Sequence, residues 1–143
     1  MILSRSADYG LRALMFLAQR EDPSPAPLDQ IAQAQAVPPA LLSKILQTLV
    51  KAKILRSQKG YGGGFTLIAD PAQLSLEQVV ELIDGPFTVF ECLSDESFCT
   101  LCEGCKLKSK FRELQATMLG VLGGTSIADL IDSPEKAPVT GKR

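Results

Sequence analysis

A glycine-rich segment between two short strand patterns constrains the fold of this chain more than any other feature. The sequence Lys59-Gly60-Tyr61-Gly62-Gly63-Gly64 separates residues 54–58 from residues 65–69, and both flanking stretches favour β-strands. Glycine readily takes the positive φ angles that tight turns need. The pattern therefore predicts a β-hairpin with a basic residue at its tip.

Apolar residues at helical spacing predict three helices before this hairpin. The first covers residues 4–20, the second is short and covers residues 27–34, and the third begins at Pro38-Pro39 after a tight connection at 35–37. Helix, tight turn, helix and hairpin follow one another in the order of a winged helix-turn-helix, in which the hairpin is the wing. We therefore expect a mainly α fold with a small β-hairpin.

A fourth helix closes this predicted DNA-binding domain. Ser75 and Gln78 have the spacing of a capping box, and Gly85-Pro86 stops the apolar pattern that follows them. The DNA-binding domain is accordingly expected to span residues 1–84, followed by a cysteine-rich loop at 85–106.

The third predicted helix has two different faces. One face carries a stripe of leucine, isoleucine and valine and should be buried, whereas the opposite face carries small, polar and basic residues. Residues on this second face project together away from the core, as a helix that enters the major groove requires. They are Ala40, Ser43, Lys44, Gln47 and Lys51.

The formal net charge of −1 conceals an uneven distribution. Residues 1–70 hold eight Lys or Arg against five Asp or Glu, whereas residues 71–143 hold seven against eleven. No acidic residue lies between Asp29 and Asp70, where five of the basic residues fall. This part of the chain can approach phosphate without repulsion, although charge alone would also fit an ordinary solvated surface.

A second long helix pattern follows the cysteine-rich loop, in a segment expected to span residues 107–132. Its apolar positions repeat at helical spacing, and few residues remain after it to cover them, so a partner helix from a second subunit is expected. These positions are Leu107, Phe111, Leu114, Met118, Val121 and Leu122. The polar residues 133–143 are expected to be disordered.

The chain has no apolar run of the roughly 20 residues that span a bilayer, and it starts without the pattern of a secretory signal. We therefore expect no membrane span and a cytoplasmic protein.

All four cysteines lie between Cys92 and Cys105, with six, two and two residues in the successive gaps. A stable disulfide is disfavoured in the cytoplasm, so the cluster indicates either a metal site or a thiol redox switch. Two Cys-x-x-Cys spacings with a further upstream cysteine favour an iron–sulfur cluster, while a four-cysteine zinc site is compatible too. The chain has no histidine and no nucleotide-binding glycine fingerprint, so an enzyme is not expected.

The order of these features resembles the Rrf2-type winged-helix transcription regulators. The resemblance covers residues 1–132 and rests on Asp8-Tyr-Gly-Leu-Arg12, the Gly60–Phe65 wing, the helix at 76–85 and the cysteine loop. This family includes the iron–sulfur-assembly regulator, the nitric-oxide-sensitive repressor, the rhizobial iron regulator and the cysteine-metabolism repressor. The resemblance implies a homodimer with crossing C-terminal helices, a palindromic double-stranded DNA operator, and a cluster near each DNA-binding domain.

The resemblance also implies a set of cluster ligands. Cluster-bearing members use three cysteines, which correspond to Cys92, Cys99 and Cys105, although the first gap here has six residues where the family has five. Two candidates remain for the fourth ligand: Cys102 in the same loop, or Asp8 from the other subunit. An aspartate at that position favours a 4Fe-4S over a 2Fe-2S cluster, but it is equally explained as an acid in the first turn of a helix.

The expected function is therefore transcription regulation, as a repressor that senses nitric oxide, iron or redox status. Ser43, Lys44 and Gln47 would reach base edges, Lys59 and Tyr61 would approach the minor groove, and phosphate contacts would come from Arg5, Lys51 and Lys53. The alternative is a regulator without a cluster, which responds through its thiols to redox state or to a metabolite.

Overall fold

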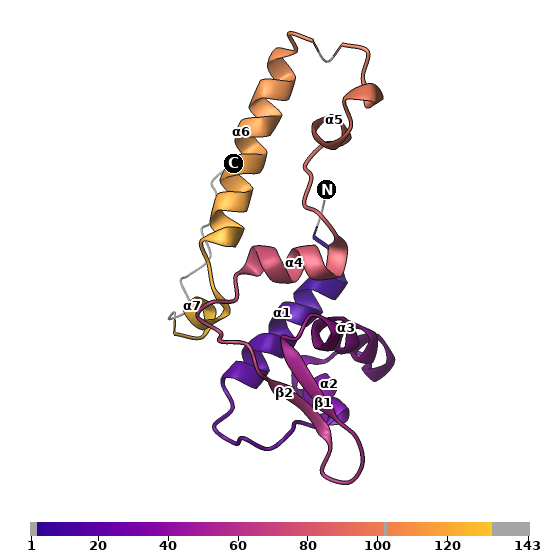
Figure 1. The fold of residues 1–143 in the computed structure, drawn as a ribbon, viewed down its shortest axis with the longest axis vertical. Helices are drawn as coiled ribbons and strands as arrows, with labels where there is room; N and C mark the ends of the chain where they lie inside the picture. The colour runs from indigo at the N-terminus through magenta and orange to yellow at the C-terminus, as the bar shows by residue number, and fades with distance from the viewer. Residues whose placement is uncertain (1–2, 102, 133–143) are drawn as a thin grey trace.

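The computed structural model describes residues 3–101 and 103–132, which form a base of short elements and a long projection (Figure 1). The base holds the four helices predicted before residue 85 and the hairpin, and the projection consists of the predicted long helix with the cysteine-rich segment beside it. The elements in chain order are α1 (Arg5–Ala18), α2 (Leu28–Gln35), α3 (Pro39–Lys51), β1 (Leu55–Gln58), β2 (Gly64–Leu67), α4 (Leu76–Asp84), α5 (Glu91–Ser94), the 3-10 turn η1 (Glu96–Phe98), α6 (Lys106–Gly123) and α7 (Ile127–Asp132).

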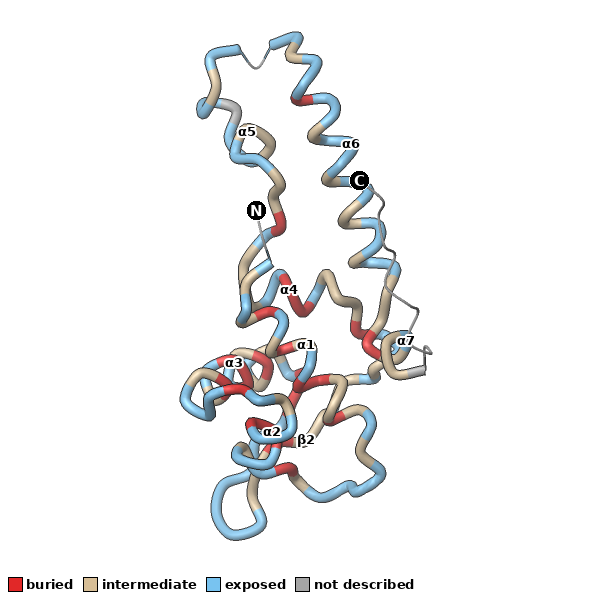
Figure 2. Tube along the Cα trace, turned by 180° about the vertical axis from the view of Figure 1, so that it is seen from behind, coloured by how far each residue is buried: buried red, intermediate tan, exposed pale blue. Residues whose placement is uncertain are grey.

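The hydrophobic core lies in the base, between α1, α2, α3, α4 and α7. Its largest fully buried side chains include Leu14, Ile31, Leu46, Val79 and Ile127, one from each of these helices. Burying such a side chain contributes about 1.5–3 kcal/mol. The projection has little core of its own, as the mainly exposed and half-buried colouring of α6 and the segment beside it shows (Figure 2).

Helix α3 follows α2 through a tight turn with a left-handed residue. Ala36 has a φ of 53° and ends α2, and Val37 is buried directly after it. Pro39 starts α3, because proline fixes a helical φ at a position whose N–H has no partner in the helix. The predicted helix-turn-helix is thus confirmed, although α2 begins one residue after Pro27.

The wing is an antiparallel hairpin in which Leu55 pairs with Leu67 and Gln58 with Gly64. A third stretch joins it through a bridge between Ala26 and Phe65, whose N–H groups each donate to the other residue's carbonyl. Gly64 must remain a glycine, since it has a φ of 152° and a Cβ there would lie 2.2 Å from the Ala26 carbonyl oxygen.

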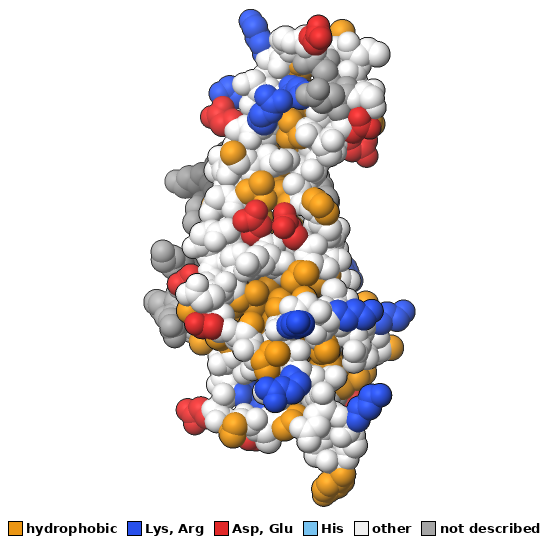
Figure 3. All heavy atoms as spheres, viewed as in Figure 1, with side chains coloured by type: hydrophobic (Ala, Val, Ile, Leu, Met, Phe, Trp, Pro, Cys, Tyr) orange, Lys and Arg blue, Asp and Glu red, His pale blue; other side chains and the backbone are white. Residues whose placement is uncertain are grey.

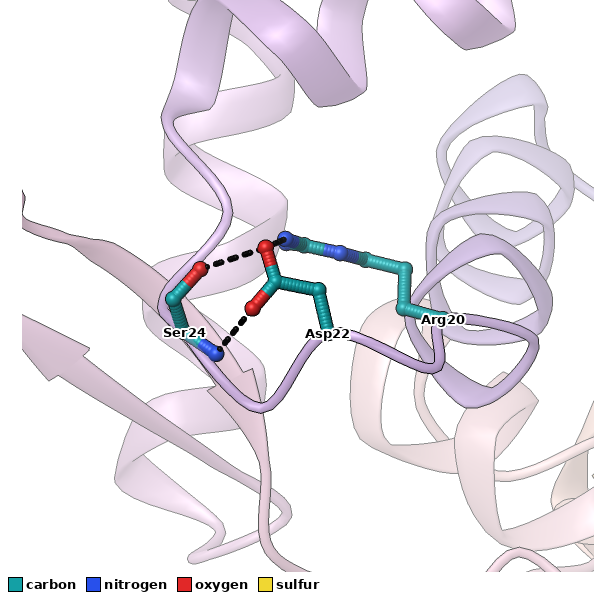
Figure 4. Close-up of polar contacts among 3 residues, drawn as sticks. All are labelled: Arg20, Asp22 and Ser24. Atoms are coloured by element: carbon teal, nitrogen blue, oxygen red, sulfur yellow. Dashed lines mark hydrogen bonds and ion pairs between the residues drawn. The ribbon is translucent and has the colours of Figure 1, made fainter.

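The loop between α1 and α2 is held by Asp22 (Figure 4). Its carboxylate accepts hydrogen bonds from the backbone N–H and the hydroxyl of Ser24, at 2.8 and 2.7 Å, and pairs with Arg20 at 3.3 Å. These contacts lower the pKa of Asp22 below its ordinary value. The turn leads the chain to Ala26 and its bridge with the wing.

The segment after α4 forms an arm, residues 87–105, that runs back along α6. The rings of Phe90 and Phe111 stack with centroids 3.7 Å apart, and the Val89 N–H donates to Oε1 of Gln115 at 3.0 Å. Sequence patterns predicted an irregular loop here, whereas the structure contains α5 and η1. No helix within residues 3–101 and 103–132 is long and apolar enough to cross a membrane, and the predicted disordered tail at 133–143 lies outside the described residues.

Candidate nucleic-acid interface and cysteine arm

The outer face of α3 is accessible, as predicted. Leu42, Ile45, Leu46 and Leu49 are buried against the base, which orients the helix. The opposite side chains are therefore directed away from the core: Ala40, Lys44, Gln47 and Lys51 are exposed, and Ser43 is half-buried. The structure thus brings together the five predicted residues of this helix on one surface.

The tip of the wing extends beyond the rest of the base (Figure 1). Lys59 and Tyr61 are exposed there, and Tyr61 has no cover at all. Gly60 and Gly62 have positive φ angles, and the Gly63 N–H donates to the Gly60 carbonyl at 3.0 Å, which closes the turn. A basic and an aromatic side chain are consequently presented together at the end of a narrow hairpin.

Further basic side chains surround these two elements, and Figure 3 shows Lys and Arg spread over the base. Arg5 is exposed at the start of α1, and Lys53 is exposed between α3 and β1 in a left-handed conformation with a φ of 60°. Arg56 is exposed on β1. Among the described residues none of these three pairs with a carboxylate, so their charges remain available to an anionic partner.

The cysteine arm carries its thiols on separate elements. Cys92 lies in α5, Cys99 follows η1, and Cys105 caps the start of α6, where its Sγ accepts the Lys108 N–H at 3.4 Å. All three are half-buried free thiols. Cys102 lies outside the described residues.

The donor chemistry of the arm fits a thiolate-bound cluster, since three free cysteines share one segment anchored to α6. In the conformation described for residues 3–101 and 103–132, however, no three cysteine or carboxylate side chains lie close enough to hold one metal ion. Binding of a cluster would therefore require the arm to close around it.

Asp8 lies apart from the cysteines of its own chain. It is exposed in the first turn of α1, where its carboxylate accepts a hydrogen bond from Nε of Arg12 at 2.8 Å and raises the pKa of that guanidinium. Helix α5 lies instead beside the far part of α6 (Figure 1). In the described conformation Asp8 and the cysteines of residues 3–101 and 103–132 do not form one group of metal ligands.

Two features of this region were missed by the sequence analysis. Ser4 donates through its backbone N–H to Oδ2 of Asp84 at 3.0 Å and through its hydroxyl to Oδ1, which joins the start of α1 to the end of α4. Lys108 is only 8% exposed on a helix that is otherwise largely exposed. The Ser4–Asp84 contact spans 80 residues, so no local pattern could have indicated it.

The comparisons with known proteins agree with this architecture. The family model described as Rrf2, an iron-dependent transcriptional regulator, matches residues 3–133. The chain belongs to the Rrf2 family. It is a DNA-binding transcriptional regulator rather than an enzyme, because the proteins of this family that it matches are transcriptional regulators.

Individual relatives of this Rrf2 protein cover nearly the whole chain. The HTH-type transcriptional regulator NsrR of Bacillus subtilis is 29% identical over 136 residues, covering 94% of this chain and 93% of NsrR. The structure of CymR, the global cysteine regulator of B. subtilis, has a TM-score of 0.78 at 22% identity and covers 94% of this chain and 99% of CymR. The structure of IscR from T. potens has a TM-score of 0.70 at 22% identity and covers 92% of this chain and 86% of IscR.

Proposed function

We propose that this Rrf2 protein is a homodimeric repressor whose operator affinity is controlled by an iron–sulfur cluster bound to the cysteine arm. The observation that carries the proposal is the arm itself: three free thiols in one segment, attached at its two ends to α6 and to the DNA-binding base. The family description as iron-dependent regulators and the likeness to NsrR support it.

The outer face of α3 would contact bases in the major groove through Ser43, Lys44 and Gln47, with Ala40 allowing close approach. Lys59 and Tyr61 would enter the adjacent minor groove. Arg5, Lys51 and Lys53 would contact phosphate groups, which position the protein without distinguishing sequences. These roles rest on the accessibility of the side chains, all of which are exposed except the half-buried Ser43.

The dimer is proposed from the surface of α6. Leu107, Leu114 and Val121 are 62%, 47% and 63% exposed on this helix, and few segments of the same chain cover them. Apolar side chains repeated along an exposed helix are stabilised by a second helix. A second copy of α6 would cover them and would place two DNA-reading faces in a two-fold arrangement, as a palindromic operator requires.

Cys92, Cys99 and Cys105 are the proposed cluster ligands, with either Cys102 or Asp8 of the second subunit as the fourth. A bound cluster would supply a site that reacts with nitric oxide or oxidants and is lost when iron is scarce. Asp8 favours a 4Fe-4S cluster, and it would have to exchange its contact with Arg12 for the cluster.

The base of the arm is connected to the DNA-binding face through close packing. Asp84, the last residue of α4, binds Ser4 at the start of α1. Helices α1, α3 and α4 then meet at Gly10, where a Cβ would lie 2.4 Å from Cδ1 of Ile83 and 3.2 Å from Cγ2 of Ile45. Since these helices cannot slide past one another freely, a movement of the arm base would be transmitted to α3.

The experiment is an anaerobic purification followed by iron, acid-labile sulfide and visible absorption measurements on one sample, with operator binding of the same sample before and after cluster removal. Stoichiometric iron and sulfide together with a changed operator affinity support the proposal. An unchanged operator affinity refutes it. A protein that is still colourless after reconstitution refutes the cluster, but it does not contradict the proposal that the protein binds DNA.

A thiol switch without a cluster is the second candidate. It is favoured by the finding that Cys92, Cys99 and Cys105 do not lie close enough together in this conformation to bind one metal ion. It predicts a colourless protein in which a reversible disulfide changes operator affinity, which mass spectrometry of alkylated samples detects.

A further inference from the structure

A pocket of about 620 Å³ lies below α4, away from the cysteine thiols and from the outer face of α3. In Figure 3 hydrophobic side chains gather in this part of the base, with acidic side chains above them. A volume of this size is within the range of about 300–1,000 Å³ that is usual for small-molecule sites. None of the residues proposed to contact DNA or to hold a cluster lines the pocket as the structure describes it.

The walls of the pocket come from α4 and from the segments that join it to the DNA-reading helix, the wing and the arm. Ala52 and Ile54 join α3 to the wing, Ala69 follows the wing, Leu82 belongs to α4, and Pro86 directly precedes the arm. Leu82 is 41% exposed, so an apolar side chain at the rim remains open to a ligand. An occupant would contact the residue that ends the DNA-reading helix, the residues on either side of the wing, and Pro86 before the arm.

The polar groups of the pocket select the charge of its ligand. Among the residues that the structure describes, its polar lining residues are Asp70, Gln73, Gln78 and Glu81, so both charged groups are carboxylates and no described lysine or arginine lines it. Oε1 of Gln78 already accepts the Ser75 N–H at 3.0 Å, and one oxygen of Asp70 accepts the Ala72 N–H at 2.9 Å. The apolar surface and the two carboxylates together suit a molecule with an apolar body and a cationic group, and they repel an anion.

We propose that this pocket binds a small organic cation, an amine or guanidine with an apolar body, and that its occupancy changes the affinity of the protein for DNA. The carboxylates of Asp70 and Glu81 hold the cationic group, and the side chains of Ile54, Leu74 and Leu82 cover the apolar body. The ligand fits between α4 and the junction of α3 with the wing, and thereby alters the position of the wing relative to α3.

The test uses three probes of nearly the same shape: 4-phenylbutylamine, 4-phenylbutan-1-ol and 4-phenylbutanoate. Each is titrated into the ¹⁵N-labelled full-length protein while amide chemical shifts are recorded. The amine is expected to shift the amides of Ile54, Leu74 and Leu82, and to bind at least about threefold more tightly than the alcohol, because a partly exposed carboxylate adds a modest attraction. The butanoate is expected not to bind there.

Two variants separate the pocket from general charge effects. Glu81→Gln should weaken amine binding about threefold or more while leaving alcohol binding unchanged, whereas Glu77→Gln, on the same helix but outside the pocket lining, should leave both unchanged. Operator affinity measured with saturating amine should differ from that without it in the parent protein and less so in Glu81→Gln. Equal binding of the three probes, shifts elsewhere in the protein, or unchanged operator affinity would overturn the proposal. The test needs no cluster, so its outcome is independent of the proposed cofactor.

Discussion

The contact between Ser4 and Asp84 predicts a measurable coupling between the start of α1 and the base of the arm. In the described structure the half-buried Asp84 carboxylate accepts both the backbone N–H and the hydroxyl of Ser4, and the hydroxyl oxygen accepts the Ala7 N–H at 3.1 Å. Hydrogen bonds to charged groups contribute about 1.5–3 kcal/mol each when shielded, and less where water competes. Asp84→Ala loses both, so we expect it to cost about 2–3 kcal/mol of unfolding free energy.

Ser4→Ala removes the hydroxyl from the same carboxylate and also the cap of α1, which should cost about 1–2 kcal/mol. The double variant loses the shared hydroxyl–carboxylate bond only once. The two single costs should therefore exceed the cost of the double variant by about 1 kcal/mol, because residues in direct contact are not additive.

The assay is urea unfolding of the four proteins at one fixed protomer concentration, since association changes apparent stability. Glu81→Ala provides a control on the same helix, and its combination with Ser4→Ala should be additive. A coupling below about 0.3 kcal/mol for Ser4 with Asp84 would show that the contact does not stabilise the junction, and the proposed route from arm to α1 would fail with it.

Three further predictions concern the core, the loop and the DNA contacts. Leu46→Ala, at a fully buried position of α3, should lower the unfolding free energy by about 2–5 kcal/mol in urea titrations, and a loss under about 1 kcal/mol would contradict its place in the core. The Ser24 contacts hold the pKa of Asp22 in the folded protein below its ordinary value of 3.8, so the stabilisation is complete above that pH and is lost as the pH falls through the folded pKa. The difference in thermal stability between the parent protein and Asp22→Asn should therefore shrink on acidification. A difference that is constant with pH would argue against the Ser24 contacts. Lys51→Ala should reduce the slope of log operator affinity against log salt concentration by about 0.9 per lost phosphate contact. Lys110→Ala is the control and should leave the slope unchanged, because the Lys110 ammonium pairs with Glu113 on α6. Equal slopes for Lys51→Ala and the parent protein would show that Lys51 does not contact the DNA.

The elements that sequence patterns predicted correctly are those specified by neighbouring residues. The apolar stripe of α3 determines which side is buried, and the glycines between the strands determine the hairpin. The capping box of Ser75 and Gln78 is present with both of its hydrogen bonds. Such features depend on residues a few positions apart, where periodicity and capping act directly.

The remaining features depend on contacts between distant segments or on very short elements. Helices α5 and α7 have four and six residues, too few for a periodic pattern. The start of α7 nevertheless carried a signal, because Ser126 and Asp129 have the spacing of an N-terminal cap and are hydrogen-bonded in the structure. The pocket below α4 could not be predicted from sequence, since its walls come from segments that meet only when the base is folded.

The position of Tyr61 gives this regulator an optical reporter of its own. The chain has no tryptophan and only two tyrosines, Tyr9 half-buried in α1 and Tyr61 uncovered at the wing tip. Quenching by a dissolved agent therefore distinguishes the emission of the wing from that of the base without any label. A bound operator that covers the wing would protect one of the two signals, so wing insertion can be followed separately from contacts made by α3.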